Sequence, residues 1–206
     1  MDEIVRQALA RWPDVPHCTG WLLLDARGQW RLRDEADQAA GIAGTPVRHD
    51  ALIGLINRNY GCDERGQWYF QNGPQRVYVE LEYTPLIVRL ACDAAGTLTL
   101  TDQTGQPFVP SAAYVDDAGS VLFASAAEGR APVRVALLHD HDLDLFTDHA
   151  SLAEDGLDGT FVWRAGVSLP LKPVLRAQVP ARFGFVASPA REEALALAGG
   201  KAVRAG

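Results

Sequence analysis

The chain has 206 residues, 48% of them hydrophobic, and a formal net charge of −7. This composition is ordinary for a globular protein with a core, and the length suits one large domain or two small ones. No apolar run approaches the ~18 residues of a membrane span, and the first residues are acidic where a secretory signal would be basic. Residues 91–158 are strongly acidic, which disfavours a phosphate backbone as partner. We therefore expect a cytoplasmic protein with no membrane and no nucleic-acid partner.

The first predicted element is a short amphipathic helix over residues 3–11, with Ile4, Val5 and Leu9 on one side. Pro13 and Pro16 end it, because proline cannot continue a helix. Residues 1–16 thus form an N-terminal helical segment ahead of the first strand.

After this helix a short phrase recurs: Asp, two residues, Gly, one residue, then apolar residues at alternate positions. The four clear copies start at Asp25, Asp63, Asp93 and Asp116. A degenerate copy, without the Asp, covers residues 159–163. Aspartate caps a turn, glycine permits a positive φ, and alternating apolar residues form a strand with one buried face. Each copy therefore predicts a turn followed by a strand. The residues at the matching place in the four clear copies, which we expect to be buried, are Trp30, Trp68, Leu98 and Val121.

The phrase belongs to a larger pattern: a hairpin, a Gly-x-Pro segment, a second hairpin and a Pro-x-Arg-Val strand. This order occurs once in residues 17–90 and again in residues 91–150, which predicts two tandem related modules. The first module has room for a helix over residues 48–59, and the second has only residues 109–113 at that place. The alternative is that any two β-rich segments share such turn chemistry.

The remaining chain is predicted to be a C-terminal extension, residues 151–188, docking on the modules, and a loosely ordered tail, residues 189–206. Prolines interrupt the extension, so we expect its strands to be short or at an edge. The polar stretch 34–43 is predicted to be a connector. The fold class that follows is α+β, mostly β: two tandem related hairpin-based modules with a few short helices.

Five polar residues form the candidate ligand-binding site, because they are predicted to converge at one end of the first module: Arg58, Asn59, Asn72, Gln75 and Arg76. Arginine is the natural reader of a carboxylate or phosphate. The alternative is structural, with asparagine capping a helix and arginine pairing with nearby carboxylates.

A second cluster, His139, His141 and His149, could hold a metal ion, because alternate residues of an extended segment face the same way. That arrangement would indicate a metal-dependent hydrolase. We favour the alternative, in which a strand ends here and a short helix begins with Asp140 or Asp142 as its N-cap. The prediction is therefore no catalytic residue, no metal and no cofactor.

The three cysteines are odd in number and lack the spacing of a metal clip, which favours reduced thiols in the cytoplasm. Cys62 and Cys92 each precede a repeat aspartate, where the other copies carry an apolar residue. We expect all three cysteines to be chemically quiet.

The stretch from Trp21 to Trp30, the helix ending at Tyr60 and the run from Asp63 to Pro85 together resemble a proteobacterial family of unknown function. More distantly, the pattern is similar to a second uncharacterised bacterial family with paired hairpin–helix–hairpin units, for which a role in signal transduction has been suggested. The resemblance covers residues 1–90 well and the remainder loosely. It implies the fold and brings no catalytic residues. The short segment 109–113 departs from the distant family's fuller helix.

The function is therefore expected to be non-enzymatic: a signalling or regulatory module that binds a small-molecule ligand or a protein partner. A metal-dependent hydrolase is the rival from another class. A scaffold whose strand edges take up a partner chain is a third hypothesis.

Overall fold

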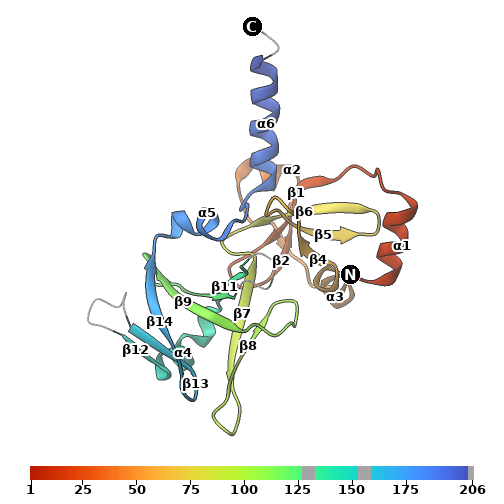
Figure 1. Ribbon diagram of the computed structural model, residues 1–206. Coiled ribbons are helices and arrows are strands. Elements are labelled where there is room, and N and C mark those ends of the chain that lie inside the picture. The colour runs from red at the N-terminus through yellow and green to blue at the C-terminus, as the bar shows by residue number, and fades with distance from the viewer. Residues whose placement is uncertain (127–132, 153–158, 204–206) are drawn as a thin grey trace. The chain divides into compact units, whose positions relative to one another are not determined.

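The computed structural model describes residues 1–126, 133–152 and 159–203, with side chains up to residue 199. Two β-sheets dominate it, one of six strands and one of eight (Figure 1). Each sheet belongs to its own compact unit. Unit 1 contains residues 1–25, 29–82 and the segment from Phe185 onward, and unit 2 contains residues 26–28 and 83–184. The predicted fold class, α+β and mostly β, is confirmed.

Unit 1 is built on an antiparallel sheet with one parallel pair at its centre. Its strands are β1 (Cys18–Leu24), β2 (Trp30–Leu32), β3 (Thr45–Pro46), β4 (Tyr60–Cys62), β5 (Trp68–Asn72) and β6 (Gln75–Leu81). They are ordered β3-β2-β1-β6-β5-β4, and β1 runs parallel to β6. Its helices are α1 (Glu3–Arg11), α2 (Glu35–Ala40), α3 (Asp50–Arg58) and α6 (Pro189–Val203).

The core of unit 1 lies under α3, whose Ile56 is fully buried together with Leu24 and Val79. Trp30 is also buried, as predicted, and its indole nitrogen donates to Asn57 Oδ1 at 2.7 Å. The expectation that Trp68 is buried is wrong: Trp68 is half-buried and packs against Tyr60, with ring centroids 4.9 Å apart. It lies on β5 opposite Cys62 of the short edge strand β4, which covers it only in part.

Unit 2 is also built on a mostly antiparallel sheet. Its strands are β7 (Leu86–Cys92), β8 (Leu98–Asp102), β9 (Pro110–Asp116), β10 (Val121–Ser125), β11 (Val135–Leu138), β12 (Ala150–Leu152), β13 (Gly159–Arg164) and β14 (Val167–Val174). Their order is β12-β13-β14-β9-β10-β11-β7-β8. The helices are η1 (Asp140–Asp142), α4 (Leu143–Asp148), η2 (Arg176–Gln178) and α5 (Val179–Phe183). Phe146 of α4 packs on Phe123 and Phe161 in the core, and Leu98 and Val121 are buried as predicted.

The two sheets share one succession of strands. In unit 1 a hairpin, β1–β2, is joined by a parallel pairing of β1 with β6 to the antiparallel run β6-β5-β4. In unit 2 the hairpin β7–β8 is joined by a parallel pairing of β7 with β11 to the antiparallel run β11-β10-β9. The compact units divide after Glu82, whereas the predicted module boundary at residue 90 falls inside β7. The reason is that the strand before each repeat aspartate forms the first arm of the hairpin.

The recurrent phrase is one turn structure. At Asp63, Asp93 and Asp116 the Oδ1 atom accepts the backbone N–H groups two and four residues on, at 2.7–3.0 Å. The glycine three residues on has a positive φ, as at Gly119, where φ is 81°. Asp102 builds the same turn with Thr104, Gln106 and Gly105. This further copy was missed because Pro107 and Phe108, rather than alternating apolar residues, follow its glycine.

The expectation that strands beyond residue 165 are short or at an edge is wrong for β14, an eight-residue strand inside the sheet. The positions of the two prolines in β14 explain how the sheet accommodates them. Pro170 lies where β14 pairs with β13 alone, and Pro173 lies where it pairs with β9 alone. At each proline one side of β14 therefore has no paired residue, and the backbone N–H that proline lacks is not needed on that side. The extension thus adds its strands to the second sheet.

Three local features differ from the sequence prediction. The polar stretch 34–43 contains helix α2, which Asp34 and Asp37 cap reciprocally and Gly41 ends with φ 67°. The predicted loose tail is helix α6 as far as Val203, since its alanines and leucines favour a helix over an irregular tail. The sequence favours Asn72-Gly73 as the hairpin turn between β5 and β6, because Asn-Gly suits a type I′ turn, but the turn consists of Gly73 and Pro74, one residue later. The turn of the degenerate repeat copy lies outside the described residues, and the strand that follows it is β13.

Among the described residues, none of the helices combines the length and apolar character that crossing a membrane requires.

Candidate functional site

The first half of the predicted ligand site, Arg58 and Asn59, lies at the end of α3. Asn59 is 2% exposed, and its Nδ2 donates to the Leu55 carbonyl oxygen at 2.9 Å, which fixes the side chain at the helix end. Asp2 contacts both residues. Arg58 Nε lies 3.2 Å from both Asp2 carboxylate oxygens, and Asn59 Oδ1 accepts the Asp2 N–H at 2.7 Å. The N-terminal segment therefore occupies this part of the predicted site.

The second half lies around the β5–β6 turn. Asn72 is exposed, and Gln75 Nε2 donates to the Pro16 carbonyl oxygen at 3.1 Å. The Arg76 guanidinium lies 4.1 Å from the centre of the Tyr69 ring. The backbone brings the two halves to neighbouring strands, because the Gln71 N–H donates to the Asn59 carbonyl oxygen and Gln71 pairs with Arg76. The side chains make structural contacts here, and ligand binding by these five residues stays a prediction.

The histidine–aspartate stretch forms a compact cluster of three residues. Ligand atoms of His139, Asp140 and His141 lie within 4.8 Å of one another. His149 is not in this group: it is the C-cap of α4, at the far end of that helix. His139 Nδ1 accepts the His141 N–H at 3.1 Å, and Asp140 Oδ2 accepts from Arg27 at 2.6 Å. Two of the three potential ligands are thus engaged within the protein.

The strand-to-helix transition expected here is present, but its cap differs from the prediction. His139, rather than Asp140 or Asp142, caps η1 through its ring nitrogen. Asp142 makes no side-chain cap and instead accepts two bonds from Arg89, at 2.7 and 2.8 Å, and the Leu90 N–H at 2.9 Å. Although burial opposes it, these donors lower the pKa of Asp142 below 3.8. Asp142 stands at the N-cap position of α4, as predicted, but its carboxylate bonds to β7 and does not cap that helix.

His139 should give the protein a pH-dependent stability. Burial lowers its pKa below 6.5, and Arg89 adds to the effect. In the unfolded chain this histidine binds a proton near pH 6.5, whereas in the folded chain it binds the proton only at a lower pH. The stabilisation that the neutral, buried His139 gives the folded state is fully present above pH 6.5. It is lost as the pH falls through the lowered pKa. We expect His139→Asn, which retains a capping oxygen, to reduce the loss of unfolding free energy between pH 7 and 5. Urea denaturation at both pH values measures it, with His141→Asn as the exposed control, for which an equal reduction would contradict the assignment.

Unit 1 has a cavity of about 380 Å³ between the sheet and α6, here called the α6 cavity. It is lined by His17, Thr19, Arg65, Gln67, Tyr78, Val186, Pro189, Glu192, Glu193 and Ala196. Gln67 and Tyr78 are buried, and Arg65, Glu192 and Glu193 are exposed. Charges of opposite sign therefore surround a partly apolar hollow.

Hydrogen bonds order the walls of the α6 cavity. Arg65 donates to Gln67 Oε1 at 2.8 Å, and Tyr78 donates to Asp63 at 3.1 Å. From the facing helix, Glu193 accepts the Thr19 hydroxyl at 2.8 Å, and its other oxygen lies 3.7 Å from His17 Nε2. These hydrogen bonds connect β1 with α6, and β6 with the β4–β5 turn, around the cavity.

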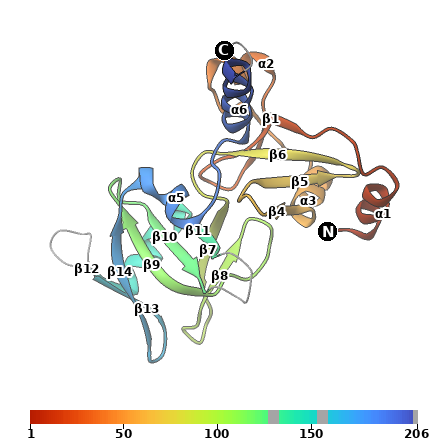
Figure 2. The same ribbon diagram turned by 45° about the horizontal axis from the view of Figure 1, so that its top comes forward.

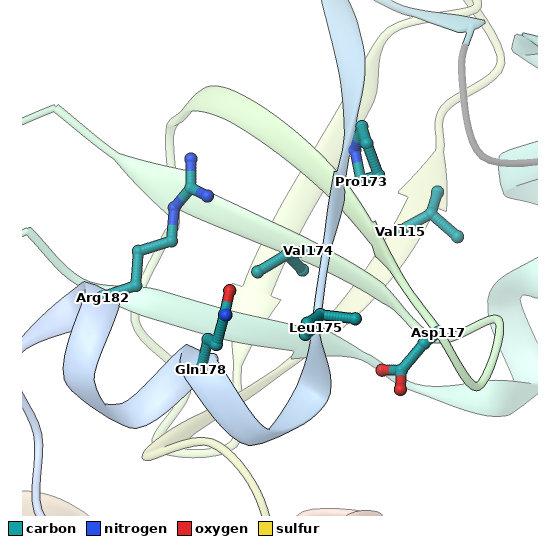
Figure 3. A pocket seen from close by; sticks show the side chains of 7 residues that line it. All are labelled: Val115, Asp117, Pro173, Val174, Leu175, Gln178 and Arg182. Carbon is teal, nitrogen blue, oxygen red and sulfur yellow. The ribbon is translucent and has the colours of Figure 1, made fainter.

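Two cavities in unit 2 are smaller. One, of about 210 Å³, has apolar walls from Val115, Val174 and Leu175, and Figure 3 shows Asp117 and Arg182 at its opposite ends. The other, of about 270 Å³, is lined by Arg27, Ser120, Asp140 and Arg176 among others. Its arginines pair closely with carboxylates, Arg27 with Asp140 at 2.6 Å and Arg176 with Asp116 at 3.3 Å, whereas Arg65 of the α6 cavity lies 3.8 Å from Asp63. Ligand sites usually enclose ~300–1,000 Å³, which favours the α6 cavity.

Sequence reasoning missed the α6 cavity because its wall comes from residues expected to form a loose tail. A signal was present: Glu192 and Glu193 follow Pro189, a helix-start pattern of proline with acidic residues in the first turn. Nothing in the sequence indicated that this helix would lie against β1 and β6.

The three cysteines are free thiols. Burial raises the pKa of Cys62 to about 11, with Asp63 adding to it, and burial also raises the pKa of Cys18. Cys92 is exposed, so a reagent can reach it. We expect the exposed Cys92 to react with a thiol reagent at pH 7.5, and Cys62 to react at least 10-fold more slowly than Cys92. Mass spectrometry of the labelled peptides checks the order, and fast labelling of Cys62 would contradict it.

The fold thus defines a β-rich α+β protein built from two sheet-based units. A sequence model of the family DUF2944, described as "Protein of unknown function (DUF2946)", matches residues 1–190. The chain belongs to this family, which confirms the expected membership in a family of unknown function.

Two solved structures are similar to this chain, and both are titled as DUF1285 family proteins. The protein from Silicibacter pomeroyi DSS-3 is 16% identical with a TM-score of 0.46, over 84% of this chain and 97% of that one. The protein from Shewanella baltica OS155 is 14% identical with a TM-score of 0.38, over 62% of this chain and 91% of that one. No curated protein matches the sequence.

Proposed function

We propose that the protein is a non-enzymatic binding protein and that the α6 cavity holds a small zwitterionic molecule, such as a free amino acid or a dipeptide. The observation that carries the proposal is the separation of charge around the cavity. Arg65 stands on the turn between β4 and β5, and Glu192 and Glu193 stand on the facing helix.

The chemistry of the lining fits such a ligand. A guanidinium pairs with a carboxylate through two parallel hydrogen bonds, and carboxylates accept from an ammonium group. The rings of His17 and Tyr78, 5.3 Å apart edge to face, offer an apolar surface between the charges. A cavity of about 380 Å³ suits a molecule of this size.

The metal-dependent hydrolase is less well supported. A catalytic metal site needs about three protein ligands and an open position. At the histidine–aspartate cluster, His139 Nδ1 caps η1 and Asp140 pairs with Arg27 at 2.6 Å. While these interactions hold, His139 can offer a metal ion only Nε2 and Asp140 only Oδ1. Absence of a bound metal stays a prediction, which elemental analysis of protein purified without a histidine tag can check.

A thermal-shift screen tests the proposal. We expect one or more free amino acids or dipeptides at millimolar concentration to raise the melting temperature, because a ligand that binds only the folded state stabilises it. The N-acetylated and amidated forms of the same compound each lack one charge and should lose the effect.

Variants of the cavity locate the binding. We expect Arg65→Gln and Glu193→Gln each to weaken the affinity 10-fold or more in calorimetric titration, since a hydrogen bond to a charged group contributes about 1.5–3 kcal/mol. Glu64→Gln is the matched control, because Glu64 is an exposed acid beside Arg65 that does not line the cavity. Equal affinity in all three variants would place any binding elsewhere.

The tandem relationship of the units and a regulatory role also belong to the proposal. The shared strand succession supports duplication, and a protein that binds without catalysing fits a part in signal transduction. Duplication predicts that Trp30 superposes on Leu98 and Trp68 on Val121 in an experimental structure. A different strand register in the two units would contradict it.

A further inference from the structure

The α1 segment, residues 1–12, is attached to unit 1 mainly at its first turn. There the Asp2 backbone N–H donates to Asn59 Oδ1 at 2.7 Å, and the Asp2 carboxylate accepts from Asn59 Nδ2 at 3.3 Å. Arg58 Nε adds two contacts of 3.2 Å to the same carboxylate. Asn59 thus forms hydrogen bonds with both the backbone and the side chain of Asp2.

The receiving residues form a site fixed in advance. Asn59 is 2% exposed, and its amide nitrogen also donates to the Leu55 carbonyl oxygen at 2.9 Å. Its backbone N–H donates to Ile56, and its carbonyl oxygen accepts the Gln71 N–H. Its side chain therefore holds one orientation, with Arg58 beside it to supply the charge.

The rest of the segment is weakly held. Val5 is the buried residue of α1, whereas Ile4 is 74% exposed and Trp12 is 50% exposed. Pro13 and Pro16 stiffen the connector to β1, and Gln75 holds it at the Pro16 carbonyl oxygen. Figure 1 and Figure 2 both show α1 at the turn end of β5 and β6, at the margin of the sheet. A segment with few buried contacts opens readily.

We propose that Arg58 and Asn59 form a docking site for the acidic first turn of a helix in a partner protein, and that residues 1–12 are an internal competitor for it. The occupant is argued from the structure, because a helix of that chemistry already lies there: an aspartate before its first turn and a valine three residues later. Because residues 1–12 are tethered to the same chain, their effective concentration at the site is high. A partner helix must therefore bind the site more tightly than this segment does, or bind while the segment is detached. This site is independent of the α6 cavity and of the ligand proposed for it.

A peptide competition experiment on the full chain tests the proposal. The probe is a fluorescent synthetic peptide of residues 1–16, followed by anisotropy. We expect weak binding to the unchanged protein and at least 10-fold tighter binding to the full-length Asp2→Ala variant, whose own segment is released. The same probe carrying Asp2→Ala should lose at least 10-fold in affinity for that variant. A probe carrying Arg6→Gln is the control, because the Arg6 side chain pairs with Glu3 in its own helix.

Further variants keep the test decisive. Replacing the buried Asn59 could unfold the protein, so Arg58→Gln, at an exposed residue, is added to the Asp2→Ala chain and should weaken the probe at least 5-fold. Equal binding of both probes, or no gain in the Asp2→Ala chain, would overturn the proposal. A dimer that dissociates on Asp2→Ala, seen by light scattering, would also overturn it, since the occupant would then be the segment of a second copy.

Discussion

Replacing Asp116 with alanine is expected to lower the free energy of unfolding by about 3–5 kcal/mol. This carboxylate is 0% exposed, and both of its oxygens are engaged. Oδ1 accepts the turn amides of Ala118 and Ser120 at 2.9 and 2.7 Å, and Oδ2 accepts the Tyr83 hydroxyl at 2.8 Å. Arg176 approaches Oδ2 at 3.3 Å, and its guanidinium lies 3.7 Å from the centre of the Tyr83 ring. Alanine would leave the buried hydroxyl and two amides without their acceptor.

The chain contains a matched control for this variant. Asp93 makes the same two turn bonds, with Ala95 and Thr97, but is exposed. Its replacement by alanine should cost about 1 kcal/mol, the usual effect of losing a cap that water can replace. Urea denaturation of both variants, followed by fluorescence, gives the difference. Equal effects at the two positions would show that the buried partners of Asp116 contribute nothing.

Replacing Glu80 with alanine is expected to release α6 from unit 1. Glu80 is 5% exposed on β6, and its two oxygens accept the Ser188 hydroxyl at 2.5 Å and the Ala190 N–H at 3.0 Å. A negative charge at this end also suits the helix dipole. We expect amide exchange in residues 190–199 to rise about 10-fold, which corresponds to ~1.4 kcal/mol of local opening.

Glu80→Gln separates hydrogen bonding from charge at this position. It keeps one acceptor oxygen, so the exchange of α6 should lie between that of the unchanged protein and that of Glu80→Ala. Hydrogen exchange measured by mass spectrometry reports both variants. If α6 exchanges equally in all three proteins, Glu80 does not hold the helix, and the wall of the α6 cavity depends on other contacts.

Local chemistry explains which elements could be predicted from the sequence. The helix over residues 3–11 and the hairpin arms around Asp93 follow from apolar period and turn residues, which act over a few positions. The prediction for β14 failed because the tolerance of Pro170 and Pro173 depends on which neighbour pairs at each residue. That pairing is a property of the assembled sheet.

The candidate site was harder to predict for the same reason. Arg58 and Asn59 stood out in the sequence, but their contact, Asp2, lies 56 and 57 positions away. Glu193 meets Thr19 across 174 positions. No periodicity or motif reports contacts of this separation, so the α6 cavity becomes visible only in three dimensions.

Binding of a small zwitterion in the α6 cavity can be located by nuclear magnetic resonance. The most stabilising amino acid or dipeptide is titrated into isotope-labelled protein, and the shifted signals are assigned. We expect the largest shifts at residues lining the α6 cavity, including the Arg65 Nε–H and the amides of Gln67 and Glu193. Shifts concentrated around Asp117 and Arg182 in unit 2, or none at saturating ligand, would contradict it.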